Sequence, residues 1–140
     1  MPEPELTEDG LRFVTERHLA TLSTLSANGS IHAVPVGFTV HDGTAFVITS
    51  RASQKVLNVR RSGHATLCQV EGAGWITLIG RAQILEDPAS VALAVSRYAA
   101  RYRQPRVNPE RVAIAIDIQR MLGSGGLLPR RRFRLLRRCL

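Results

Sequence analysis

The sequence predicts an α+β fold, mainly β, in which six strands form a small antiparallel barrel with short helices between them. Apolar residues alternate with a period of two over most of the chain, short turns join most of the strand-like runs, and three stretches have helical spacing. A doubly wound nucleotide-binding fold is disfavoured, because no GxGxxG follows a strand and no P-loop occurs.

The first half of the chain begins with a helix and continues with strands. We expect the helix over 7–17, because Thr7 is a partial N-cap and Leu11 and Val14 lie on one helical face. A period of two then begins, and the turn sequences Asn28-Gly29 and Asp42-Gly43 are typical of hairpins. The three strands are therefore predicted at 19–25, 31–40 and 44–49.

The second half alternates helices with strands. A helix is predicted from Ser53 to Ser62, before Gly63, and another from Asp87-Pro88 to about Tyr102. The remaining strands are predicted at 64–70, 75–84 and 112–122.

Length and composition indicate one soluble globular domain. The chain has 140 residues, of which 44% are hydrophobic and 21% charged, and no apolar run is long enough to span a membrane. The start, MPEPELTEDG, has no apolar signal core, so we expect a cytoplasmic protein without a membrane partner. Cys68, Cys139 and the four histidines show no metal-ligand spacing, so neither a metal site nor a disulfide framework is expected.

Most of the positive charge belongs to the C-terminal end. The formal net charge is +8, but six arginines lie within the last eleven residues, where no acidic residue occurs. The rest of the chain is nearly neutral, so we expect no nucleic-acid partner. We divide the chain into a barrel domain, 1–124, and a basic tail, 125–140, which we interpret as incidental.

A candidate anion site lies in the segment 47–63. A strand ends at Thr49-Ser50 and a helix begins near Ser53, which brings hydroxyls and free backbone amides to one helix N-terminus. Lys55, the only lysine of the chain, lies in the first turn. The segment therefore predicts a phosphate site, and the alternative is an ordinary surface helix capped by serine.

Several separated motifs resemble one known family. They are ERHLATL (16–22), SQK (53–55), LCQVEGAGW (67–75), RYAARYRQPRVNPERV (97–112) and RMLGS (120–124). From Leu11 to Leu122 the chain resembles the split-barrel flavin-binding proteins related to pyridoxamine 5′-phosphate oxidase. The resemblance is closest to the actinobacterial branch that binds the deazaflavin coenzyme F-420, and within that branch to the mycobacterial members that reduce biliverdin. It implies a homodimeric split β-barrel with F-420 as cofactor, and FMN as the alternative.

The resemblance also implies a set of cofactor-binding residues. Five lie along the ring, three line the sugar chain, three hold the phosphate, and one tryptophan reaches the cofactor from the second subunit. In that order they are Ala33, Val34, Pro35, Val36 and Gly37; Ile48, Thr49 and Ser50; Ser53, Gln54 and Lys55; and Trp75. Trp75 equally fits a core residue. Pro35 cannot donate a strand hydrogen bond, so it should lie where the sheet meets the ligand.

Candidates for substrate contact lie on the last helix and in the turn after it. They are Arg97, Tyr98, Arg101, Arg103 and Arg106. Arginines could pair with the propionates of a tetrapyrrole or with the glutamyl tail of F-420, and the alternative is a solvated basic helix face.

The expected function is hydride transfer from reduced F-420 to a conjugated small-molecule acceptor, and the acceptor we expect is biliverdin or a related bilin. No side chain is an evident catalytic base, which fits chemistry carried by a cofactor. The arginine-containing ending with which pyridoxamine phosphate oxidases hold their substrate is missing, so that substrate is not expected. An FMN-dependent oxidase or reductase, and a non-catalytic carrier of flavin, F-420 or haem, remain the alternatives.

Overall fold

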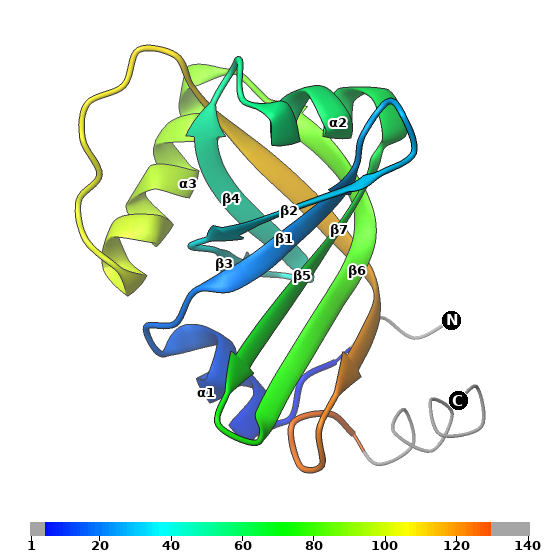
Figure 1. Cartoon of the computed structure of the whole chain (residues 1–140). Coiled ribbons are helices and arrows are strands. Elements are labelled where there is room, and N and C mark those ends of the chain that lie inside the picture. Colours follow the sequence, from blue (N-terminus) through cyan, green and yellow to red (C-terminus); the bar gives the residue numbers. More distant parts are fainter. Residues whose placement is uncertain (1–4, 130–140) are drawn as a thin grey trace.

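The computed structural model describes residues 5–129, which form one antiparallel sheet with helices around it (Figure 1). The sheet has seven strands in the order β2-β1-β5-β6-β7-β4-β3. The helices are α1 (Glu8–Thr15), α2 (Gln54–Ser62) and α3 (Pro88–Arg101). The strands are β1 (Ala20–Leu25), β2 (Ile31–Val36), β3 (Thr39–His41), β4 (Thr44–Ser50), β5 (His64–Glu71), β6 (Gly74–Leu85) and β7 (Arg111–Gly123). The predicted mainly-β fold class is confirmed.

The chain connection between β2 and β3 requires the sheet to curl. These strands lie at opposite ends of the strand order, yet only Gly37 and Phe38 separate them in the chain. The three steps from Val36 to Thr39 span at most about 11 Å, so the two edges of the sheet must approach each other. No ladder between β2 and β3 joins the edges within residues 5–129, and the barrel is therefore split.

The single strand predicted over 31–40 is wrong, because the structure forms β2 and β3 there and has seven strands where six were expected. Phe38 leaves the ladder because α3 supplies the partners of its backbone. Its N–H donates to the Tyr102 hydroxyl at 3.1 Å, and its carbonyl accepts from the Arg101 guanidinium. Gly37 packs below the same helix, since a Cβ there would lie 2.8 Å from the Tyr98 ring.

The other predicted elements are confirmed to within a few residues, and so are their end signals. Thr7 caps α1 by accepting from the Gly10 N–H at 3.0 Å, and Asp87 caps α3 by accepting from the Ser90 N–H at 2.9 Å. Gly63 ends α2 with a φ of 72°. Alternate strand residues fill the core, and those less than 2% exposed include Leu22, Val47, Leu67, Ile76, Leu78, Ile114 and Ile116.

The barrel extends beyond the boundary predicted at 124. Leu128 is only 4% exposed and belongs to the hydrophobic core, while Thr7 donates through its hydroxyl to the Gly126 carbonyl at 2.6 Å. Residues 125–129 therefore pack with the domain, and the part of the predicted tail at 130–140 lies outside the described residues. No helix within 5–129 is long and apolar enough to cross a membrane.

The first prediction concerns Gly80, which lies at a register shift between β6 and β7. A Cβ at this position would lie 1.9 Å from the backbone oxygen of Asp117, so the strands would have to separate. We expect Gly80→Ala to lower the free energy of unfolding by about 1–3 kcal/mol in urea denaturation. Gly125→Ala, where no atom lies within 4 Å of the added Cβ, is the matched control and should change it little. Equal stability of the two variants would contradict the tight crossing of β6 and β7.

Candidate functional site

The N-terminus of α2 has unpaired donors. Ser53 is the N-cap, but its side chain makes no capping bond and instead lies 3.2 Å from the Thr49 hydroxyl. Consequently, no oxygen within residues 5–129 accepts from the backbone N–H of Gln54 or Lys55. The first turn also has no acidic residue to compensate the positive end of the helix dipole. This helix end can therefore hold an anion.

Lys55 adds a cation to the same place. It is half-buried, and no carboxylate of the described residues forms an ion pair with it. Partial burial without a counter-ion lowers the pKa of its ammonium, because desolvation disfavours the charged form. A phosphate at this position would return to the ammonium the stabilisation that burial removes.

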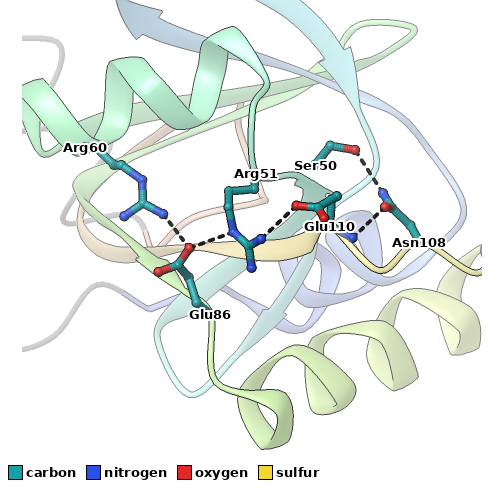
Figure 2. Close-up of polar contacts among 6 residues, drawn as sticks. All are labelled: Ser50, Arg51, Arg60, Glu86, Asn108 and Glu110. Carbon is teal, nitrogen blue, oxygen red and sulfur yellow. Dashed lines mark hydrogen bonds and ion pairs between the residues drawn. The ribbon is translucent and has the colours of Figure 1, made fainter.

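Arginine and glutamate side chains fix the loop before α2. Figure 2 shows Arg51 between two carboxylates, with Nε 3.1 Å from Glu86 Oε1 and Nη1 2.7 Å from Glu110 Oε2. Arg60 of α2 donates to the same Glu86 oxygen at 2.8 Å. The hydrogen bond from Arg51, followed by the charge of Arg60, lowers the pKa of Glu86. The charge of Arg51 is thus compensated, whereas no described carboxylate compensates the charge of Lys55.

Two asparagines that the sequence analysis missed support the site. Asn108 donates to the Ser50 hydroxyl at 2.9 Å and so connects the end of β4 to the segment before β7 (Figure 2). Asn58, fully buried on α2, accepts from Gln54 Nε2 at 2.8 Å and donates to the Thr24 hydroxyl at 3.1 Å. The spacing of four residues between Gln54 and Asn58 is the sequence signal that could have identified this pair.

The strand predicted to follow the cofactor ring lies at an edge of the sheet. Within the described chain β2 pairs with β1 alone, and Pro35 lies opposite Thr21 in that ladder. Ala33 and Pro35 are exposed, Val34 is half-buried, and Val36 faces the core. The three residues predicted to line the sugar chain, 48–50, are the last residues of β4. Three residues separate them from the start of α2.

Trp75 lies far from Lys55 within one chain. It is the second residue of β6, next to the turn with β5, whereas α2 lies at the other end of these strands (Figure 1). The residue is 37% exposed, so it is not a core residue. Within one chain, Trp75 and Lys55 therefore lie at opposite ends of β5 and β6.

The candidate arginines on α3 differ in their surroundings. Arg101 is half-buried and donates to the carbonyls of Glu16 and Phe38 and to Gln69 Oε1, and its burial lowers the pKa of the guanidinium. These contacts are internal and hold the fold together. Arg97 lies 5.0 Å from the centre of the Phe46 ring and forms no ion pair with a described residue.

The loop after α3 carries the remaining candidates. Arg103 and Arg106 are exposed, and neither side chain forms an ion pair with residues 5–129. The last candidate, Tyr98, lies on α3 itself, and its ring contacts the Tyr102 ring with the two centres 4.8 Å apart. The roles predicted for these residues in substrate binding stay predictions.

Comparison with known proteins identifies the family. A model of the family described as "Pyridoxamine 5′-phosphate oxidase" matches residues 6–124. The chain belongs to the pyridoxamine 5′-phosphate oxidase family. It is 53% identical over 127 residues, which cover 89% of this chain and 93% of the relative, to a protein of Mycobacterium tuberculosis (strain CDC 1551 / Oshkosh) named F420H(2)-dependent biliverdin reductase.

Solved structures show the same fold at lower identity. A conserved hypothetical protein of M. tuberculosis matches with a TM-score of 0.75 and 22% identity, over 88% of this chain and 87% of that protein. A structure described as an F420 reductase matches with a TM-score of 0.68 and 16% identity, over 79% of this chain and 94% of that protein.

The residues at the start of α2 fit the phosphate of a flavin-type cofactor of this family. Two unpaired amides and an ammonium without a counter-ion supply three donors and no competing negative charge. By contrast, residues 5–129 contain no group of three or more His, Cys, Asp or Glu side chains placed to hold a metal ion.

The second prediction compares Tyr98 of α3 with Tyr102, the residue that caps its C-terminus. The Tyr102 hydroxyl donates to the His18 carbonyl at 2.6 Å and accepts from the Phe38 N–H, whereas the Tyr98 hydroxyl has no hydrogen bond with residues 5–129. Tyr102→Phe leaves two part-buried backbone groups unpaired and should lower the free energy of unfolding by about 1–3 kcal/mol. Tyr98→Phe is the matched control and should change it little. Equal values for the two variants in urea denaturation would remove the structural role of Tyr102.

Proposed function

We propose that this chain is an F-420-dependent oxidoreductase that transfers hydride from the reduced cofactor to a conjugated acceptor, biliverdin or a related bilin. The observation that carries the proposal is the unpaired N-terminus of α2 with the half-buried Lys55 ammonium. The name of the M. tuberculosis relative, which is 53% identical, supports the choice of F-420 and of a bilin.

In this proposal the chain binds the cofactor by its phosphate. Lys55 donates a charge-assisted hydrogen bond, and the amides of Gln54 and Lys55 donate from the backbone. Ser53 and Ser50 contribute hydroxyls, and Asn108 fixes the hydroxyl of Ser50. The ion pairs of Arg51 are exposed and add little to stability, but they hold the loop that presents these donors.

The remaining task of the chain is to orient two reactants and exclude water. Reduced F-420, when bound, supplies the hydride. Ala33 to Val36 of the edge strand β2, together with Gly37 after it, would lie along the ring and hydrogen-bond to its polar edge through backbone groups. A rigid strand suits this role because correct orientation of the reactants accounts for much of the rate.

We further propose that the enzyme is a homodimer whose sites are shared between subunits. Lys55 and Trp75 lie at opposite ends of one barrel, so each site would take its phosphate donors from one subunit and its tryptophan from the other. The exposed side chain of Trp75 would then cover the cofactor of the partner. A cytoplasmic location and a small-molecule acceptor belong to the same proposal.

Two alternatives use the same fold. An FMN-dependent oxidase or reductase would bind FMN more tightly than F-420. A carrier would bind its cofactor or haem without turnover. Titration with both cofactors, followed by mixing of the complex of reduced F-420 with biliverdin in a stopped-flow spectrometer, distinguishes them. Bleaching of biliverdin absorbance in step with oxidation of F-420 supports the reductase, and binding without either change supports the carrier.

The third prediction is that Lys55 anchors the phosphate. In a fluorescence titration with F-420, Lys55→Ala should weaken binding by about 1.5–3 kcal/mol, because one charge-assisted hydrogen bond is lost. Lys55→Arg should recover part of this loss, since a planar guanidinium does not superimpose on an ammonium. Neither variant should be less stable than the parent protein, because Lys55 is half-buried and has no described partner to lose.

A pH series separates this role from a general effect of charge. Protonated Lys55 binds the phosphate, and its pKa lies below the ordinary lysine value, so affinity should fall as the pH rises through that lowered pKa. Lys55→Ala and Lys55→Arg should lack this fall, because neither side chain titrates there. Unchanged F-420 and FMN affinity in Lys55→Ala would refute the phosphate site.

The fourth prediction tests sharing of the site between subunits. Lys55→Ala and Trp75→Ala proteins should each bind F-420 weakly. After their subunits are exchanged by mixing, heterodimers should contain one intact site, and about a quarter of all sites should regain parental affinity by random pairing. Failure to regain any tight site, although mass spectrometry shows heterodimers, would contradict the shared site, and so would a monomer in sedimentation at micromolar concentration.

A further inference from the structure

A hollow of about 240 Å³ lies between α1, β3 and α3, away from the start of α2. Val14 of α1, Val40 of β3 and Ala100 of α3 form its apolar part. Its polar part is formed by Thr15, Thr39, His41, Arg97 and Arg101. None of these lining residues takes part in the phosphate site proposed for the cofactor.

Thr39 has a buried hydroxyl without a partner. The residue is only 7% exposed, and no atom of the described chain hydrogen-bonds to its Oγ1. Buried hydroxyls in folded proteins nearly always have a partner, because an unpaired one loses its hydration without compensation. Because the Oγ1 atom has almost no accessible surface, a ligand in the hollow can pair with it only after the Thr39 side chain turns toward the hollow, and that turn breaks no hydrogen bond with the described chain.

Arg97 gives the hollow a positive charge. Its guanidinium lies 5.0 Å from the centre of the Phe46 ring, which holds the side chain in place, and no described carboxylate pairs with it. No aspartate or glutamate within residues 5–129 lines the hollow, and Arg101 adds a second cation to its wall. A neutral or cationic ligand would leave these charges uncompensated.

We propose that the hollow binds a carboxylate carried on a compact apolar body. The carboxylate accepts hydrogen bonds from the guanidinium of Arg97 and from the hydroxyl of Thr39, and the apolar body contacts Val14, Val40 and Ala100. The carboxylate belongs either to a small free acid or to an arm of the bilin acceptor or of F-420. In the second case the inference rests on the proposed function.

The size of the hollow limits the ligand. A cavity of about 150 Å³ lined by apolar side chains accepts benzene, and pockets for drug-sized ligands begin near roughly 300 Å³. The observed volume of about 240 Å³ lies between these values and fits a benzene ring with one carboxylate. Benzoate is therefore a suitable probe, and benzamide is a probe of the same shape without the charge.

The test is a titration of the full chain, free of cofactor, followed by ¹H–¹⁵N correlation spectra. Benzoate should shift the amide signals of Thr39, Val40 and Ala100 with saturation in roughly the millimolar range, as expected for a ligand of this size. Benzamide should bind more weakly. Absence of saturable shifts, or shifts centred on the first turn of α2, would overturn the proposal.

Two substitutions test the residues named. Arg97→Gln should weaken benzoate binding roughly tenfold or more, and Thr39→Val, which keeps the shape and removes the hydroxyl, roughly three- to fivefold. Thr39→Val should also raise the unfolding midpoint, because an unpaired buried hydroxyl is lost. Arg120→Gln, on the exposed part of β7, is the matched control and should leave benzoate affinity unchanged. Equal benzoate affinity in Arg97→Gln and in the parent protein would refute the site.

Competition identifies the source of the carboxylate. If biliverdin or F-420 displaces benzoate from the hollow, the carboxylate belongs to an arm of that molecule. If both bind elsewhere and benzoate stays, the ligand is a free small acid. Because benzoate binding is measured without cofactor or turnover, its failure is distinguishable from failure of the proposed reductase activity.

Discussion

The fold depends on how two edges of one sheet are joined by two residues. Gly37 and Phe38 carry the chain from β2 to β3 across the opening of the barrel, and no ladder between those strands closes it within the described chain. The closing bonds come from α3 instead. Arg101 and Tyr102 bind both backbone groups of Phe38 and also the carbonyls of Glu16 and His18, which follow α1. One helix end therefore fixes the edge strand, the crossing and the N-terminal helix at once.

The start of α2 shows the opposite arrangement, in which charge is left unpaired. Arg51 and Arg60 satisfy their charges with Glu86 and Glu110, whereas Lys55 is half-buried and has no described carboxylate partner. Without a bound anion, an uncompensated cation beside unpaired amides raises the free energy of the folded protein. A bound anion removes this cost. Sites that bind or react commonly retain such unfavourable local features, so this position differs from the rest of the surface for a physical reason.

The sequence predicted what depends on local periodicity and end signals. Alternation located the strands, and Thr7, Gly63 and Asp87 marked helix ends that the structure confirms. It also placed Lys55 at a helix N-terminus. The break at Phe38 could not be predicted, because it depends on backbone hydrogen bonds to residues more than sixty positions away. The unpaired hydroxyl of Thr39 had no sequence signal, since a threonine in a strand ordinarily indicates nothing more than β-propensity.

Two arginines one helical turn apart have different roles because their side chains contact different partners. Arg97 and Arg101 lie on one face of α3, and sequence alone assigns them the same task. Arg101 reaches inward, where three protein acceptors satisfy its donors, while Arg97 lies over Phe46 with its charge open to the hollow. Because the contacts of Arg101 fix the position of α3, they also fix Arg97 relative to Thr39. The geometry that closes the barrel thus preorganises the Arg97 guanidinium for a carboxylate, and only the Thr39 hydroxyl would have to turn toward the ligand.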